Sequence, residues 1–246
     1  MSVVIFQHHD AAGPGRLGAT LRDHGFKLDI REPHKFPVGS PRGCPTDLDN
    51  VHALVVLGGS QNVTDIEQYD WMKAEVELMK LAHAREIPII GICLGCQMIG
   101  HAFGGKVAPK DKPAVGFYPV SVTVPGQTET MMAGISWNHP QLFSCGQEVT
   151  QLPAGSVLLA TSANTKNAAF KLGVRTYAFQ YHFECDRPMT DGLMKASCGD
   201  MAKACVTEGD IAAQTEKHYQ EYARLSDRLC VNLATYLFPS TRRLSA

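Results

Sequence analysis

Ten residues near the middle of the chain decide its architecture: Pro88-Ile89-Ile90-Gly91-Ile92-Cys93-Leu94-Gly95-Cys96-Gln97. Ile89–Ile92 is a short, wholly apolar run that predicts a buried strand, and Leu94–Phe103 has the spacing of a helix. Cys93 lies between them, with a glycine two residues before it and another two residues after it. A sharp turn from strand to helix has no room for side chains at those two places, so the pattern predicts a nucleophile elbow that displays Cys93 above a sheet.

The same alternation of apolar strands and helices extends on both sides of this elbow. Strands are predicted at Val3–Phe6, Phe26–Ile30 and Ala53–Leu57, helices at Gly15–His24 and Ile66–Ala84, and a loop at Glu32–Asn50. Strands that are apolar throughout indicate a parallel sheet covered on both faces. Further strands, predicted at Val115–Val124, Ser156–Thr161, Ala168–Leu172 and Tyr177–Tyr181, add an antiparallel portion. We expect one domain over residues 1–246, with 189–246 as a C-terminal helical extension.

Composition narrows the functional classes. The 246 residues are 44% hydrophobic and 19% charged, with a net charge of −1, as in ordinary globular proteins. The sequence has no basic cluster of the kind that would indicate nucleic-acid binding. Neither a signal peptide nor a membrane-spanning run is apparent, and the eight scattered cysteines fit reduced thiols, so we expect a cytoplasmic protein. No feature indicates an oligomeric state.

The elbow cysteine has the surroundings of a nucleophile. A helix N-terminus favours the thiolate form of Cys93, and the amide of Leu94 is placed to donate to an oxyanion. Alternatives stay open at this point. A cysteine at the end of a core strand can be merely buried, and Cys93 with Cys96 forms a Cys-x-x-Cys pair typical of redox or zinc sites. A zinc site lacks a second such pair, and the chain is large for a dithiol redox domain.

Two other segments carry polar or glycine residues that could complete a site. His182 and Glu184 follow an apolar run, and on a strand they would share one face, where Glu184 could orient the imidazole toward Cys93. Gly58-Gly59 follows another buried strand, where a plain turn is the simpler interpretation. Beside a nucleophile, the amide of Gly59 would be the second oxyanion donor.

Taken together, these motifs resemble the class I glutamine amidotransferases, especially stand-alone domains similar to the amidotransferase half of GMP synthase. The likeness runs from about Val3 to Glu184 and rests on Gly-Ile-Cys-Leu-Gly-x-Gln at 91–97, Gln180-Tyr181-His182-Phe183-Glu184, and Glu148–Pro153. It implies a flavodoxin-like, three-layer α/β sandwich with a mostly parallel central sheet and an added antiparallel portion.

The resemblance also implies a reaction and its residues. Cys93, His182 and Glu184 would release ammonia from glutamine through a glutamyl thioester, Gly59 and Leu94 would form the oxyanion hole, and Gly58 and Gln97 would contact the substrate. No metal or organic cofactor is implied. A separate synthase or acceptor subunit would use the ammonia, because residues 185–246 are too few for such a domain.

Three departures from the family pattern keep other functions open. Cys96 stands where the family has histidine, Cys145 begins a segment that elsewhere reads His-Gly-Asp, and Ala114 lies where an acidic residue is usual. A γ-glutamyl peptidase or related amide hydrolase is therefore a second hypothesis. A non-catalytic binding protein that retains the fold is a third.

Overall fold

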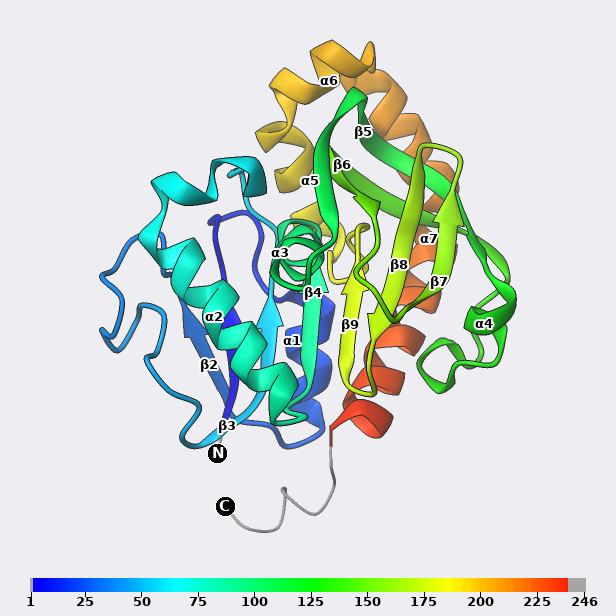
Figure 1. The fold of residues 1–246 in the computed structure, drawn as a ribbon. Coiled ribbons are helices and arrows are strands. Elements are labelled where there is room, and N and C mark those ends of the chain that lie inside the picture. Colours follow the sequence, from blue (N-terminus) through cyan, green and yellow to red (C-terminus); the bar gives the residue numbers. More distant parts are fainter. Residues whose placement is uncertain (1, 239–246) are drawn as a thin grey trace.

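The computed structural model describes residues 2–238 (Figure 1). Its strands are β1 Ser2–Phe6, β2 Leu28–Arg31, β3 Val51–Val56, β4 Ile89–Ile92, β5 Lys106–Val122, β6 Asn138–Gln151, β7 Ser156–Ser162, β8 Thr165–Leu172 and β9 Thr176–Phe179. Its α-helices are α1 Gly15–Asp23, α2 Asp70–Ala84, α3 Leu94–Ala102, α4 Val124–Gln127, α5 Arg187–Ala196, α6 Cys198–Ala204 and α7 Glu208–Asn232. Two 3-10 helices, η1 Val63–Gln68 and η2 Thr130–Met132, and a π-helix, η3 Leu233–Leu237, complete the described elements.

One sheet joins all nine described strands, in the order β2-β1-β3-β4-β9-β8-β7-β5-β6. From β2 to β9 every neighbouring pair is parallel, and from β9 to β6 every pair is antiparallel. The expected α/β class with a parallel core and an added antiparallel portion is confirmed. The antiparallel portion is as large as the parallel one, because β6 joins it and β5 is longer than expected.

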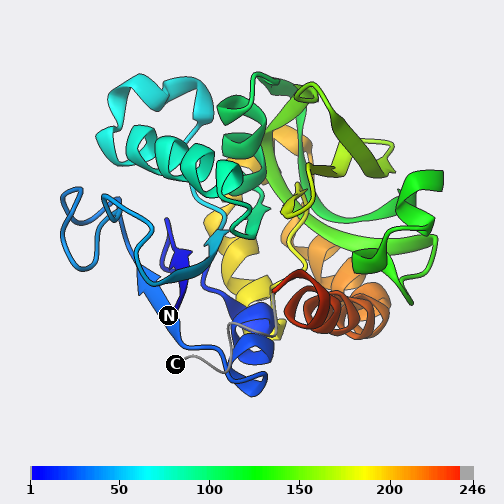
Figure 2. The ribbon, with the colours of Figure 1, turned by 60° about the horizontal axis from the view of Figure 1, so that its bottom comes forward.

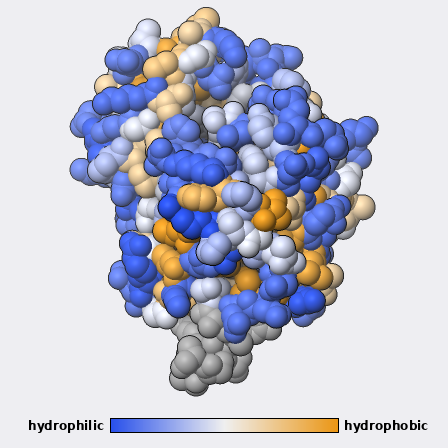
Figure 3. Space-filling model, turned by 90° about the vertical axis from the view of Figure 1, so that its left-hand side faces the viewer, coloured by the Kyte–Doolittle hydropathy of each residue, from blue (hydrophilic) through white to orange (hydrophobic). Residues whose placement is uncertain are grey.

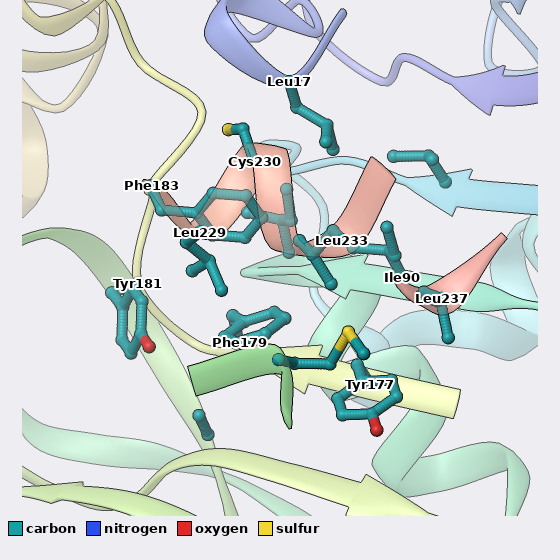
Figure 4. Close-up of a cluster of buried hydrophobic side chains, with 14 of the residues drawn as sticks. Leu17, Ile90, Tyr177, Phe179, Tyr181, Phe183, Leu229, Cys230, Leu233 and Leu237 are labelled. Carbon is teal, nitrogen blue, oxygen red and sulfur yellow. The ribbon is translucent and has the colours of Figure 1, made fainter. Parts of the chain in front are cut away.

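Helices cover both faces of the parallel half, which explains why its strands are apolar throughout (Figures 1 and 2). Val3 and Ile5 point to the face that α1 and α7 cover, whereas Val4 and Phe6 point to the face under α2 and α3. Figure 4 shows the first of these cores, in which Leu229 and Leu233 of the C-terminal helices meet aromatic rings from β9 and the segment after it.

The C-terminal helices are part of this packing. Besides the core under α7, a third apolar cluster joins α5, α6 and α7 to β5 and β6. Residues 239–246 of the expected extension, like Met1, lie outside the described residues, and the single-domain assignment stays a prediction.

Within residues 2–238, no helix combines the length and apolarity that a membrane crossing requires. The side of the molecule that carries β2 and α2 is mostly hydrophilic, with small apolar patches (Figure 3).

Several expected elements differ from the structure. The long helix expected at Ile66–Ala84 is η1 followed by α2, because Tyr69 between them is extended, with φ −125° and ψ 100°. The strand expected to start at Val115 begins at Lys106 and accommodates an irregularity between Pro109 and Ala114. The strand expected at Tyr177–Tyr181 ends at Phe179. No strand was expected at Asn138–Gln151, where β6 forms.

The glycines of the elbow give a stability prediction. A Cβ on Gly95 would overlap the backbone carbonyl of Val56 in β3, which cannot move without disturbing the sheet. We expect Gly95→Ala to lower the free energy of unfolding by about 3 kcal/mol or more, measured by urea denaturation. Gly209→Ala on α7, where the nearest atom would lie at 3.7 Å, should change it by less than about 1 kcal/mol. Equal effects would contradict the steric argument.

Candidate active site

Cys93 occupies a strained position between β4 and α3. Its φ of 52° and ψ of −102° lie in a region that non-glycine residues rarely adopt. The amide of Cys93 donates to the carbonyl oxygen of Phe179 at 2.8 Å, and the thiol lies 3.4 Å from the carbonyl oxygen of Ser144. Backbone carbonyls of β9 and β6 therefore hold the turn in place. The side chain of Cys93 lines a cavity of about 650 Å³.

His182 and Glu184 form a buried pair beside this cysteine. The Nδ1 atom of His182 lies 2.7 Å from Oε1 of Glu184, and both side chains are almost wholly buried. The expectation that a strand places them on one face is wrong, because β9 ends at Phe179 and residues 180–184 form an irregular segment. The pair meets through a local bend that tertiary hydrogen bonds hold.

Those hydrogen bonds come from three distant parts of the chain. The amide of His182 donates to the carbonyl of Leu142 on β6 at 2.8 Å. The hydroxyl of Tyr222, on α7, donates to the carbonyls of His182 and Cys185 at 2.6 and 3.0 Å. The amide of Arg16, in α1, donates to the carbonyl of Glu184 at 2.8 Å. Helix α7 thus positions the histidine although it contributes no side chain to the cavity.

The environment of His182 favours its charged form. Burial alone would lower the pKa of His182, but the carboxylate of Glu184 and the side chain of Cys93 outweigh burial and raise that pKa well above its usual 6.5. Among the described residues, Nε2 of His182 has no hydrogen-bond partner. An imidazolium next to Cys93 would stabilise the thiolate of a nucleophile.

The neighbouring cysteines have a different character. Burial raises the pKa values of Cys96 and Cys145 far above the usual range for a thiol, so both stay protonated near neutral pH. Burial likewise raises the pKa of Cys185 to about 12. His182, Glu184 and Cys185 bring potential metal-ligand atoms within 4.8 Å of one another. Two of these residues, His182 and Glu184, are already hydrogen-bonded to each other.

The glycine loop after β3, Gly58-Gly59, lies against Cys93 and His182. A Cβ on Gly58 would lie 2.8 Å from Cε1 of His182 and 3.6 Å from Cβ of Cys93, so a side chain there would displace the imidazole. Gly58 is not among the residues that line the cavity, whereas Gly59, Leu94 and Gln97 are. Leu94 is the first residue of α3, where helix amides lack intrahelical partners.

A second buried pair, which the sequence reasoning missed, supports this loop. His8 Nδ1 lies 3.2 Å from the carbonyl oxygen of Leu57, and Nε2 lies 3.1 Å from both carboxylate oxygens of Glu75 on α2. A carbonyl only accepts, so Nδ1 carries the proton. The Cβ of His8 lies 2.7 Å from where a Cβ of Gly59 would be. The His8–Glu75 pair therefore fixes both sides of the glycine loop.

The sequence holds one signal for this pair. Glu75 lies on α2 between Met72 and Met79, in the stripe of residues that faces the core. A charged residue in an apolar stripe needs a buried partner, and burial indeed raises the pKa of Glu75. His8 follows a buried strand and is the partner, but nothing local to either residue links the two.

The rest of the cavity wall comes from β5, β6 and the helices α5 and α6, at the top of Figure 1. Cys145, Gly146 and Gln147 line it, whereas Ala114 is buried among apolar side chains. Lys110 lines it too, and its ammonium is paired with Glu148 at 3.0 Å. The departures at Cys96 and Ala114 thus lie behind the wall, while the departure at Cys145 is part of it.

The chain is similar to proteins of one known family. The family model described as "Glutamine amidotransferase class-I" matches residues 18–194, which include Cys93, His182 and Glu184. A GMP synthase of Porphyromonas gingivalis is 30% identical over 141 residues, 57% of this chain and 26% of its own length. This chain thus spans about a quarter of that relative. A glutamine amidotransferase-like protein of Salmonella typhimurium, YfeJ, is 29% identical over 210 residues, 83% of this chain and 84% of its own.

Solved structures share the fold. A glutamine amidotransferase from Methylobacillus flagellatus superposes with a TM-score of 0.81 at 20% identity, covering 94% of this chain and 93% of its own. One from Thermotoga maritima gives 0.80, also at 20% identity, covering 96% and 98%. At this identity the similarity establishes the arrangement of elements only. The resemblance inferred from the motifs is confirmed at the level of family and fold.

The buried pair predicts a pH titration. Because the folded pKa of His182 lies above the unfolded value of 6.5, the pair stabilises the fold fully below pH 6.5, and this contribution falls as the pH rises through the folded pKa. We expect NMR titration of the His182 ring to give a pKa above 6.5 in the wild type and a lower one in Glu184→Gln. His218, which is half-buried on α7 and lies outside the cavity, should titrate identically in both. An unchanged His182 titration in the variant would refute the assigned cause.

Proposed function

This chain belongs to the class I glutamine amidotransferase family, and on that premise we propose that Cys93, His182 and Glu184 hydrolyse the side-chain amide of glutamine. The observation that carries the proposal is the meeting of a strained, cavity-lining cysteine with a buried histidine–carboxylate pair. A nucleophile, a base and an orienting group in that order are the components of triad catalysis.

In the first half of the proposed reaction, the thiolate of Cys93 attacks the amide carbon and forms a carbon–sulfur bond. The carbonyl oxygen becomes an oxyanion, which the amides of Gly59 and Leu94 stabilise. The imidazolium of His182 then gives its proton to the amide nitrogen, the carbon–nitrogen bond breaks, and ammonia leaves. Glu184 holds the ring so that Nε2 faces the reacting atoms.

In the second half, the glutamyl thioester is hydrolysed. Neutral His182 takes a proton from water through Nε2, and the hydroxide adds to the thioester carbon. The same two amides stabilise the second oxyanion, the carbon–sulfur bond breaks, and glutamate leaves. Cys93 is returned as thiolate and His182 as imidazolium, the ionisation that the raised pKa of the histidine favours.

A specific observation favours a second candidate, hydrolysis of γ-glutamyl amides or peptides. The cavity of about 650 Å³ falls in the range of about 300–1,000 Å³ that accommodates ligands much larger than glutamine. Its lining includes the apolar side chains of Leu193 and Ala196 on α5, which suit a leaving group larger than ammonia. The first chemical steps would be the same, with an amine instead of ammonia as leaving group.

We also propose that a separate chain uses the ammonia if glutamine is the substrate. The relatives named GMP synthase are longer than the part that this chain matches, which agrees with an acceptor activity outside the matched region. The cytoplasmic location expected from the sequence remains a prediction.

Ammonia release from L-glutamine tests the proposal. We expect turnover by the wild type and a fall in kcat of about 10³-fold or more in Cys93→Ala and in His182→Asn, because each removes a group that bonds or transfers a proton in the transition state. Hydroxylamine added during turnover should yield the γ-glutamyl hydroxamate, which reports the thioester.

The matched control is Cys205→Ala, an exposed cysteine outside the cavity, which should retain full activity. Retention of activity in Cys93→Ala would contradict the proposed nucleophile. If γ-glutamyl peptides are cleaved with a higher kcat/KM than glutamine, the second candidate is correct. If neither is cleaved, the non-catalytic alternative stands.

His8 provides an independent prediction about the oxyanion loop. In His8→Asn the side-chain amide can replace Nδ1 as donor to Leu57, whereas in His8→Gln it can replace Nε2 toward Glu75 but not the bond to the loop. We expect His8→Asn to keep kcat within about threefold and His8→Gln to lower it about tenfold or more, with KM little changed.

Steady-state kinetics with glutamine, or with the best γ-glutamyl substrate, would measure this difference, and thermal unfolding would check that both variants fold. Equal losses in the two variants would show that His8 serves packing alone.

A further inference from the structure

The cavity wall formed by β6 and the loop before η1 carries oxygen acceptors that no donor among the described residues satisfies. Gln147 is 5% exposed; its Nε2 donates to Thr64 at 2.7 Å, and its Oε1 is buried without a partner among residues 2–238. Oε1 of Gln61, another lining residue, is likewise buried without a hydrogen-bond partner in the described part of the chain. Nε2 of Gln97 donates to the backbone carbonyl of Gln147 at 2.9 Å but makes no hydrogen bond to its side-chain Oε1. This wall is therefore suited to a ligand that donates hydrogen bonds.

An acidic side chain from helix α6 completes this wall. An oxygen of Asp200 would lie 3.4 Å from a Cβ on Gly146, which places the carboxylate directly over β6. Among residues 2–238, the charge partner of Asp200 is Lys203, at 3.5 Å, and the lysine side chain is 72% exposed. A loose pair of this kind contributes little and leaves the carboxylate available. Asp200 lies beyond residues 18–194, the part of the chain that matches the family model.

The wall lies at a defined distance from the nucleophile. The thiol of Cys93 contacts the carbonyl of Ser144, and the hydroxyls of Ser144 and Ser197 lie 2.6 Å apart, which ties the junction of α5 and α6 to this point of β6. Gly146 is two residues further along, roughly 7 Å at the rise of a strand. In glutamine, four bonds of about 1.5 Å separate the amide carbon from the α-nitrogen, a span of roughly 5 Å. An α-ammonium bound at the wall could therefore belong to a molecule whose amide carbon is at Cys93.

We propose that Asp200 binds the α-ammonium group of the substrate, with Oε1 of Gln147 as a further acceptor. The substrate class is then L-γ-glutamyl compounds with a free α-amine, whether the leaving group is ammonia or an amine. This inference rests on the proposed function, which it extends by naming the group that selects the substrate. An ammonium donates hydrogen bonds and carries the charge that a partly buried carboxylate binds.

The test compares two variants with two substrates. Asp200→Asn removes the charge at similar volume, and Asp191→Asn removes one from α5 at a residue outside the cavity. L-glutamine carries the α-amine, whereas 4-carbamoylbutanoate is the same molecule without it. We expect Asp200→Asn to raise KM for L-glutamine about tenfold with kcat little changed, since a hydrogen bond to a charged group has about that value. KM for 4-carbamoylbutanoate should be equal in wild type and Asp200→Asn, and Asp191→Asn should match the wild type throughout.

A binding measurement separates this inference from the proposed chemistry. Calorimetric titration of Cys93→Ala with L-glutamine should give a Kd that rises about tenfold when Asp200→Asn is added. If the wild type turns over glutamine but Asp200→Asn changes neither KM nor Kd, the inference fails and the proposed function stands. If glutamine binds in an Asp200-dependent way without turnover, the inference stands and the proposed function fails. Equal losses for both substrates would show that Asp200 merely stabilises α6, and absence of both binding and turnover would overturn the two proposals together.

Discussion

The turn at Cys93 is the constraint on which the site depends. It requires a cysteine with positive φ between a central strand and a helix, and it is possible only because Gly95 lets α3 start directly against the backbone of β3. The parallel half of the sheet, with both faces covered, supplies the rigid frame that holds such a strained residue. The close approach of α3 to β3 also brings the glycine loop after β3 next to Cys93. This contact between α3 and β3 therefore places the thiol and the proposed oxyanion donors together.

The histidine depends on longer-range interactions. His182 and Glu184 lie in an irregular segment whose carbonyls are held by Tyr222 of α7 and by the first turn of α1. Helix α7 buries its apolar face on the sheet, and its Tyr222 orients the His182–Glu184 pair. The C-terminal helices thereby serve the site twice. α7 positions its base, and α5 and α6 build the outer wall of its cavity, where Asp200 lies.

Local sequence patterns predicted the parallel strands, the elbow and the family, because apolar runs and glycine spacing are imposed by short-range sterics. They failed where the cause is remote. β6 was missed because Pro140 and Gly146 interrupt its apolar pattern, and it forms through its long pairing with β5. The prediction that His182 lies on a strand was wrong because residues far along the chain, Arg16, Leu142 and Tyr222, hold the bend there. The His8–Glu75 pair and the position of Asp200 needed coordinates, since Glu75 lies far along the chain from His8 and Asp200 lies far from Gly146.

The most direct test of the central claim is covalent labelling with a diazo-ketone analogue of glutamine, followed by peptide mass mapping. The account predicts one adduct, on Cys93, suppressed by excess glutamine, although Cys93 is nearly buried and Cys198 and Cys205 are exposed. Selectivity for a buried thiol would require substrate-like binding and an activated thiolate. Labelling confined to the two exposed cysteines, or labelling of Cys93 that glutamine does not suppress, would contradict it.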